Sequence, residues 1–163
     1  MKLLYLLLGG NIGDREATLY SAIQYLSEEI GEICQCSSLY ESEPWGMNKA
    51  DQFLNQVVLL KTEMTAETVL ERILRIEERL GRKRDLFSIG YQSRPIDIDI
   101  LFFDSEIIQT AKLTIPHPEI QNRKFVLVPL CEIAVDFIHP VLHETVENLL
   151  ITCTDPLNTT RYK

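Results

Sequence analysis

Residues 96–103 read Ile-Asp-Ile-Asp-Ile-Leu-Phe-Phe, a run of strong β-propensity that carries two carboxylates. Side chains on a strand alternate between the two faces of a sheet. Asp97 and Asp99 are therefore expected on one face, and the isoleucines around them on the other. Two carboxylates one pleat apart can hold a hard cation such as Mg²⁺, which favours one or two carboxylates together with substrate phosphates. Taken alone, the pattern also fits a half-buried strand whose solvent face is acidic.

Upstream of this strand, the chain alternates between strand and helix patterns. Strands are predicted at residues 2–8, 33–41 and 53–62, and helices at 14–30 and 66–80. Thr65 is placed to cap the second helix, and Gly31 and Gly81 are placed to end the two helices. The order strand, helix, strand, strand, helix, strand predicts an α+β protein with a ferredoxin-like βαββαβ core.

The remaining segments complete a single expected domain over residues 1–163, because no repeat or linker-like stretch divides the chain. Loops are predicted at 42–52 and 82–95, where Gly, Pro and polar residues gather. Beyond residue 103 we expect additional short strands at 107–108 and 113–115, and short helices at 122–134 and 144–151. Pro129 is expected to interrupt the first of these helices.

Composition excludes several classes of protein. The 163 residues are 45% hydrophobic and 25% charged, as in ordinary globular proteins, and the net charge of −8 gives no basic footprint for nucleic acid. The longest apolar run, residues 3–8, is far shorter than the roughly 20 residues that span a membrane. The four cysteines form no CxxC pair, so we expect reduced thiols in a cytoplasmic protein. From the net charge and the short apolar runs, we expect neither nucleic-acid nor membrane partners.

Basic residues gather on both sides of the aspartate pair. Arg82, Lys83, Arg84 and Arg94 come before it, and Lys112, His117, Arg123 and Lys124 come after it. In an acidic chain this favours a phosphate chain held by arginines and bridged by a metal, because the planar guanidinium binds phosphate through two hydrogen bonds. The alternative for residues 82–84 is a solvated helix end, where cations are favoured anyway.

An aromatic group precedes and opens the third predicted strand. Trp45, the only tryptophan, lies in the loop after Ser42 and Pro44, and Phe53 and Asn55 follow. Aromatic rings with an amide suit a flat heterocycle, which would stack on the rings while the amide binds its edge. Packing in the core or the loop is the alternative for both aromatic residues.

Read together, these segments resemble the 6-hydroxymethyl-7,8-dihydropterin pyrophosphokinase family from the first strand to about residue 134. The resemblance rests on six motifs in the family's order, of which the most specific is Arg-Pro-Ile-Asp-Ile-Asp-Ile-Leu at 94–101. The others are residues 8–14, 40–46 with 53–55, 76–84, 113–118 and 122–127.

The resemblance implies transfer of the terminal pyrophosphate of ATP, the co-substrate, to the hydroxymethyl group of a reduced pterin, with release of AMP. It implies that Asp97 and Asp99 bind two Mg²⁺ ions, that Arg82 and Arg94 act on the phosphates, and that the protein is a monomer. The residues implied for the pterin are Ser42, Pro44, Trp45, Phe53, Asn55 and Phe125. Those implied for ATP are Glu77, Arg82, Arg84, Tyr91, Arg94, Ile100, Lys112, Thr114, His117 and Arg123.

The chain departs from the family pattern in three places. Leu74 stands where some members of the family place a glutamine that contacts ATP. Gly10 stands where the family usually has serine, and the loop between Arg84 and Arg94 lacks the usual Trp-Gly-Pro-Arg, with Tyr91 near the position of that tryptophan. Two other functions stay open at this point. One is a ferredoxin-like module that binds a nucleotide or metal without turnover, and the other is a metal-dependent phosphohydrolase that uses the same carboxylates.

Overall fold

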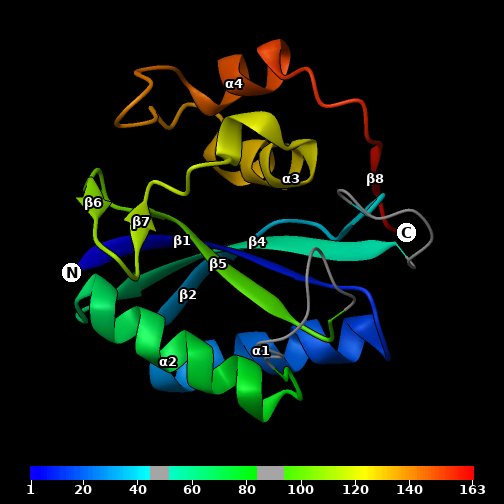
Figure 1. The fold of residues 1–163 in the computed structure, drawn as a ribbon, viewed down its shortest axis with the longest axis vertical. Coiled ribbons are helices and arrows are strands. Elements are labelled where there is room, and N and C mark those ends of the chain that lie inside the picture. The colour runs from blue at the N-terminus through cyan, green and yellow to red at the C-terminus, as the bar shows by residue number, and fades with distance from the viewer. Residues whose placement is uncertain (45–51, 84–93) are drawn as a thin grey trace.

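A computed structural model describes residues 1–44, 52–83 and 94–163, and the chain forms three layers around a central sheet (Figure 1). Helices α1 (Arg15–Glu29) and α2 (Ala66–Arg79) cover one face, and α3 (Lys124–Ala134) and α4 (Val146–Thr152) lie on the other. The sheet strands are β1 (Lys2–Gly10), β2 (Glu32–Cys36), β3 (Tyr40–Ser42), β4 (Phe53–Thr62), β5 (Asp97–Phe103) and β8 (Thr159–Arg161). A hairpin of β6 (Ile108–Gln109) and β7 (Thr114–Ile115) and a 3₁₀ turn (Ile120–Asn122) link β5 to α3.

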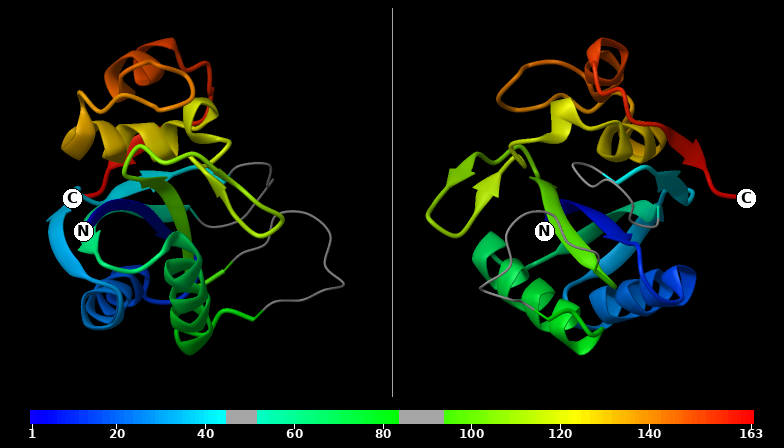
Figure 2. Two further views of the ribbon diagram at one scale, coloured as in Figure 1. Left: turned by 90° about the vertical axis from the view of Figure 1, so that its left-hand side faces the viewer. Right: turned by 45° about the vertical axis from the view of Figure 1, so that its right-hand side comes forward.

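The order of the strands confirms the expected core. The sheet runs β5-β1-β4-β3-β8, with β2 also paired to β4, and every described pair is antiparallel. The first and last strands of the βαββαβ unit, β1 and β5, thus lie side by side, with β4 next and β2 and β3 beyond it. Strand β8 extends the sheet past β3 (Figure 2).

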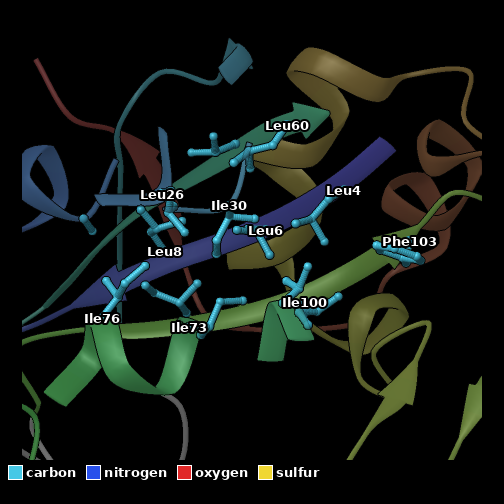
Figure 3. Packing of buried hydrophobic residues seen from close by; sticks show 14 of the residues in the cluster. Leu4, Leu6, Leu8, Leu26, Ile30, Leu60, Ile73, Ile76, Ile100 and Phe103 are labelled. Atoms are coloured by element: carbon cyan, nitrogen blue, oxygen red, sulfur yellow. The ribbon is translucent and has the colours of Figure 1, made fainter. Parts of the chain in front are cut away.

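The face towards α1 and α2 is an apolar core. Leu4, Leu6 and Leu8 alternate along β1 and point into it, where they meet Ile73 and Ile76 of α2 (Figure 3). All five side chains have no exposed surface. Burial of a leucine or isoleucine side chain contributes about 1.5–3 kcal/mol, so this layer supplies much of the stability of the fold.

The face towards α3 and α4 has a separate apolar cluster. Tyr5 and Leu7 of β1 and Val57 of β4 pack there against Leu127 and Leu130 of α3. The cluster covers only part of this face, since β1 goes on to Gly9 and Gly10 beyond it.

The predicted helix limits agree with the structure within one or two residues. Asp14 caps α1 by accepting from Ala17 N at 3.1 Å, and Thr65 caps α2 by accepting from Thr68 N at 3.2 Å. Gly81 has φ +98°, the left-handed conformation that ends a helix at glycine. In the described residues no helix is long and apolar enough to cross a bilayer.

The single strand predicted at 33–41 is wrong, because the segment forms β2 and β3 with a break between them. Ser37 sits in the break, where its N–H donates to Val57 O at 2.8 Å and its Oγ accepts from Val57 N at 3.0 Å. The serine side chain thus replaces a regular ladder bond, and both halves still pair with β4.

The predicted interruption at Pro129 is also wrong. Helix α3 runs through this residue to Ala134. Proline removes one helical hydrogen bond, the one that residue 129 would donate to the Phe125 carbonyl. Burial of the helix face that carries Leu127 and Leu130 outweighs that loss.

Candidate active site

The pocket lies where the apolar cluster on the α3 face ends. Along β1 the side chains on this face shrink from Tyr5 to Leu7 to Gly9. In register, Leu7 lies between Asp99 and Val57, and Gly9 lies between Asp97 and Asn55. The missing side chain at Gly9 leaves space for a pocket between the two acidic positions and the asparagine. It is lined by Leu7, Gly9, Ser42, Glu43, Phe53, Asn55, Asp97, Asp99 and Phe125.

One end of the pocket, called the neutral end below, is lined by Ser42, Phe53, Asn55 and Phe125, and Glu43 is the one charged side chain among its described residues. Asn55 Nδ2 donates to Ser42 Oγ at 2.7 Å, and both side chains are buried. A Cβ at Gly9 would stand 2.9 Å from Asn55 Oδ1, so a larger residue here would displace this amide. With the rings of Phe53 and Phe125, this end offers apolar surface and a fixed polar edge, as expected for a flat heterocycle.

The other end is charged, and two arginines meet at Asp97. Arg82 Nη1 lies 2.7 Å from Asp97 Oδ1, and Arg94 Nη1 lies 3.3 Å from Asp97 Oδ2. The three side chains are 18–24% exposed, so the surrounding protein screens their charges less than water would. The structure thus brings together the two arginines and the aspartate that the sequence placed up to 15 residues apart.

Glu77 of α2 binds both Arg82 and the main chain of β5. Its Oε2 accepts from Arg82 Nη1 at 2.6 Å and from Ile98 N at 2.8 Å, and its side chain is only 2% exposed. Burial raises the pKa of the Glu77 carboxyl, while the hydrogen bond from Ile98 and the charge of Arg82 oppose the rise. Glu77 therefore orients Arg82 from α2 and does not line the pocket in the structure.

Asp99 faces the pocket floor. Burial raises its pKa to about 7, and the neighbouring charges of Asp97 and Glu77 add to the rise. No described residue forms a hydrogen bond or ion pair with its carboxylate. A cation on the pocket side would relieve the repulsion between Asp97 and Asp99, and this donor set fits Mg²⁺.

The protein supplies few ligands of its own for such an ion. Among the described residues no group of three or more His, Cys, Asp or Glu side chains is arranged to hold a metal. A pair of carboxylates that leaves the other positions to water and phosphate is the arrangement that Mg²⁺ uses with nucleotides, unlike a closed protein cage.

The main chain of Arg94 is fixed by the turn after β1. Arg94 N donates to Asn11 Oδ1 at 2.9 Å, and Asn11 N donates to Arg94 O at 3.1 Å. A Cβ at Gly10 would lie 2.1 Å from Pro95 O, so this backbone approach needs a glycine. Glycine in place of serine at position 10 thus allows the close backbone approach that positions Arg94.

Basic groups continue past β5 to the start of α3. His117 N donates to Leu101 O at 3.0 Å, which places the ring beside β5, and its Nδ1 accepts from Glu119 N at 3.1 Å. Burial lowers the pKa of the His117 imidazole, and the charge of Arg123 lowers it further. A neutral ring whose Nδ1 is an acceptor carries its proton on Nε2, where it can donate to a ligand. The Arg123 guanidinium lies 5.7 Å from the centre of the Phe125 ring at the pocket wall.

The structure describes four of the remaining predicted residues, and it does not place their side chains in the pocket. Ile100 packs in the core on the α1 and α2 face, as alternation from Asp99 requires. Thr114 and Lys112 are exposed on the β6–β7 hairpin, and Pro44 does not line the pocket. Trp45, Arg84 and Tyr91 lie outside the described residues.

The sequence analysis missed four residues that build the site. Leu7, Gly9 and Glu43 line the pocket, and Asn11 holds Arg94. Leu7 looked like any core leucine. The Gly-Gly-Asn turn at 9–11 was the available signal, because it stood among the matching motifs without an assigned role.

Comparison with known proteins gives one family. Residues 5–135 match the model of 7,8-dihydro-6-hydroxymethylpterin-pyrophosphokinase (HPPK). The 2-amino-4-hydroxy-6-hydroxymethyldihydropteridine pyrophosphokinase of Porphyromonas gingivalis is 39% identical over 86% of this chain and 95% of its own length. The enzymes of the same name from Aquifex aeolicus and Bacillus subtilis are each 42% identical, over 86% and 79% of this chain and 86% and 76% of their own lengths.

Solved structures share the fold. The crystal structure of Plasmodium falciparum HPPK-DHPS wild type with STZ-DHP superimposes with a TM-score of 0.74 at 18% identity, over 92% of this chain. This chain spans 43% of that longer one, so the likeness concerns one part of it. At this identity the match supports the fold alone.

Proposed function

The chain belongs to the 7,8-dihydro-6-hydroxymethylpterin-pyrophosphokinase family, and from this premise we propose how its pocket serves the reaction. The protein is a pyrophosphokinase of folate biosynthesis. It transfers pyrophosphate from ATP to 6-hydroxymethyl-7,8-dihydropterin and releases AMP. The observation that carries the proposal is the division of the pocket. Two aspartates lie at one end, one of them bonded to two arginines, and aromatic rings and an amide lie at the other.

The neutral end would hold the pterin. Phe53 and Phe125 offer flat apolar surfaces, and the bonded pair of Asn55 and Ser42 offers a fixed polar edge. Such a site would point the hydroxymethyl group of the pterin along the row from Asn55 past Gly9 towards Asp97. The acceptor oxygen would then meet the phosphates without a large rearrangement, which is how positioning lowers a barrier.

The charged end would hold the pyrophosphate. Asp97 and Asp99 would hold Mg²⁺, which when bound neutralises phosphate charge and makes the attacking hydroxyl more acidic. Arg82 and Arg94, already joined to Asp97, stand where their guanidinium groups can bind the transferred group. Positioned cations of this kind supply most of the catalysis in phosphoryl transfer. We assign no general base.

The ATP side would continue from β5 to the start of α3. His117 would donate from Nε2, and Arg123 would add a positive charge between the neutral imidazole and the pocket wall. Lys112 and Thr114 are proposed contacts of the nucleotide from the exposed β6–β7 hairpin. The proposed nucleotide therefore lies across the β5 edge, on the side of the sheet away from β3.

The deciding experiment incubates the purified protein with ATP, Mg²⁺ and 6-hydroxymethyl-7,8-dihydropterin and separates the nucleotides by chromatography. We expect AMP and pterin diphosphate in equal amounts, and no ADP. Release of inorganic phosphate without the pterin would favour a phosphohydrolase. Bound ATP without any turnover would favour a binding module, and either result would contradict the proposal.

Four finer expectations belong to the same proposal. They are two Mg²⁺ ions per site, a monomer, a cytoplasmic location, and one domain over residues 1–163. Titration of AMP formation against free Mg²⁺ at saturating ATP tests the ion count, since a second ion would raise the rate after ATP is already complexed. Light scattering after gel filtration tests the monomer, for which the expected mass is 18.8 kDa.

A further inference from the structure

Two strand ends set the width of the neutral end of the pocket. Strand β3 ends at Ser42 and β4 begins at Phe53, and these two residues lie opposite each other in the register. Both line the pocket. Any change in the separation or twist of the two strand ends would therefore move the surfaces on which a flat ligand rests.

A single guanidinium joins these two strand ends from the other side of the sheet. Arg15, the first residue of α1, places Nη2 2.7 Å from Glu41 Oε2 and donates from Nη1 to Gln52 O at 2.8 Å. Glu41 immediately precedes Ser42, and Gln52 immediately precedes Phe53. One planar group thus holds the residue before each pocket residue, and its two bonds fix orientation as well as distance.

The contact lies outside the pocket itself. Glu41 is adjacent to Ser42 on the strand, so its side chain points to the opposite face, towards α1. Arg15 does not line the pocket. The Arg15 and Glu41 side chains are 22% and 28% exposed, so the pair is more enclosed than an ordinary surface ion pair.

Tyr162, the residue after β8, covers the same guanidinium from its outer side. The ring of Tyr162 lies 5.5 Å from the Arg15 guanidinium carbon, and its hydroxyl donates to Glu16 Oε1 at 2.8 Å. Tyr162 N donates to Leu39 O at 2.9 Å, and β8 pairs with β3 along Glu41. The arginine is therefore held by a carboxylate, a carbonyl and an aromatic ring.

We propose that Arg15 is a positioning residue for the pterin, acting through Glu41 and Gln52 on Ser42 and Phe53. The inference rests on the proposed function, since it takes the neutral end of the pocket to be the pterin end. Arg15 has no such link to Asp97, Arg82 or Arg94 among the contacts of the described residues. Its loss should therefore affect pterin binding and spare ATP.

The chain contains a matched control. Arg79 forms an ion pair with Glu29, and its guanidinium carbon lies 4.7 Å from the Tyr25 ring centre. This trio also joins α1 to a neighbouring element, yet it does not line the pocket or adjoin its strand ends. Arg79→Ala removes the same kinds of contact from the scaffold alone.

The test compares KM values for both substrates, measured from AMP formation, and the melting temperatures of the variants. For Arg15→Ala we expect KM for the pterin to rise about tenfold, with KM for ATP within twofold and kcat within about threefold of wild type. A tenfold change corresponds to about 1.4 kcal/mol of lost binding. For Arg79→Ala we expect both KM values within twofold.

Further variants separate positioning from folding. Glu41→Gln should raise the pterin KM in the same direction, and adding Glu41→Gln to Arg15→Ala should give less than the product of the single effects. Tyr162→Phe keeps the ring and should leave the pterin KM unchanged, whereas Tyr162→Ala should raise it. Arg15→Lys should recover part of the loss, because an ammonium keeps the charge but not the planar pair of bonds.

Two results would overturn the inference. One is a pterin KM within twofold of wild type in Arg15→Ala and Glu41→Gln, whatever the melting temperature. The other is an equal rise of both KM values. Failure of the proposed function is a different outcome, because the wild-type protein would then form no AMP at all.

Discussion

The two faces of the sheet use the same strands for different purposes. Towards α1 and α2, β1 presents Leu4, Leu6 and Leu8, and all three side chains are fully buried. Towards α3 and α4, the same strand presents Tyr5, then Leu7, then Gly9. The apolar cluster that includes α3 covers Tyr5 and Leu7 and ends before Gly9. The face towards α1 and α2 is packed with leucine side chains, whereas the face towards α3 and α4 has no side chain at Gly9, its last position on β1.

The difference shows how one face of a sheet can carry a site while the other face supplies stability. Asp97 and Asp99 alternate with Ile98 and Ile100 along β5. Residues that destabilise the fold and residues that stabilise it therefore lie on the same strand. A buried carboxylate without a partner is costly, whereas a buried isoleucine contributes about 1.5–3 kcal/mol. If this division is right, substitutions on the two faces should have separable effects on turnover and stability.

The largest difference between the effect on turnover and the effect on stability is expected at Asp99. Asp99→Asn should lower AMP formation by about a thousandfold, because it removes one of the two carboxylates that can hold the metal. Its melting temperature should not fall, since no described residue bonds to this carboxylate. Chromatographic AMP assays and thermal unfolding measure the two quantities, with exposed Asp136→Asn as the control. Activity within tenfold of wild type would contradict the assignment.

The opposite behaviour is expected on the filled face. Ile73→Ala removes a side chain with no exposed surface from α2 and should lower the free energy of unfolding by about 2–5 kcal/mol. The turnover of each folded molecule should stay within twofold. Urea unfolding followed by circular dichroism gives the first value, and AMP assays corrected for the folded fraction give the second. A tenfold loss of corrected turnover would mean that the faces are not separable.

Arg94 tests the edge between the two regions. Arg94→Ala should lower turnover at least a hundredfold, comparable to the loss of one donor to the transition state. Its main chain keeps both bonds to Asn11, so the fold should hold. Arg75→Ala, on an exposed position of α2, serves as the control in the same assay. A variant within threefold of wild type would remove Arg94 from the mechanism.

The smallest effect is expected at the covered end of the pocket face. His139 is buried beside Phe102, and its Nδ1 accepts from Val141 N at 3.2 Å and Leu142 N at 3.1 Å. Burial lowers the pKa of His139, and the charge of His143 lowers it further. The unfolded chain then takes up the proton first, so stability is full above about pH 6.5 and declines as the pH falls towards the folded-state pKa.

His139→Asn isolates this contribution, because its side-chain oxygen can accept the same bonds without titrating. The wild type should lose about 1–2 kcal/mol more stability than the variant between pH 7.5 and pH 5, the value of one or two hydrogen bonds. Urea midpoints at the two pH values measure the difference. Equal losses in the two proteins would assign the acid sensitivity to other groups.

The sequence predicted what depends on local pattern. Alternation along β5 placed Asp97 and Asp99 together, and the capping residues Asp14 and Thr65 fixed the starts of the helices. Alternation also placed Ile100 on the other face, and the structure agrees with it. The side chain of Ile100 packs in the core, and the contact with ATP that the resemblance implies for this residue stays a prediction.

What the sequence left out depends on distant contacts. Nothing in the local sequence ties Asn11 to Arg94, which are 83 residues apart. Strand β8 is three polar residues without an apolar alternation, and it exists because β3 has a free edge and Tyr162 packs on Arg15. Pro129 stays helical for a similar reason, since tertiary burial outweighs the local penalty.

The close approach at Gly10 has a consequence for the design of inhibitors. A relative with serine at this position must open the 2.1 Å approach of Pro95 O to at least 3.0 Å, and the backbone that carries Arg94 must retreat with it. A compound designed to contact this arginine in an enzyme with serine at position 10 would find Arg94 at a different position in this protein. That difference offers a basis for inhibitors that select between the two kinds of enzyme.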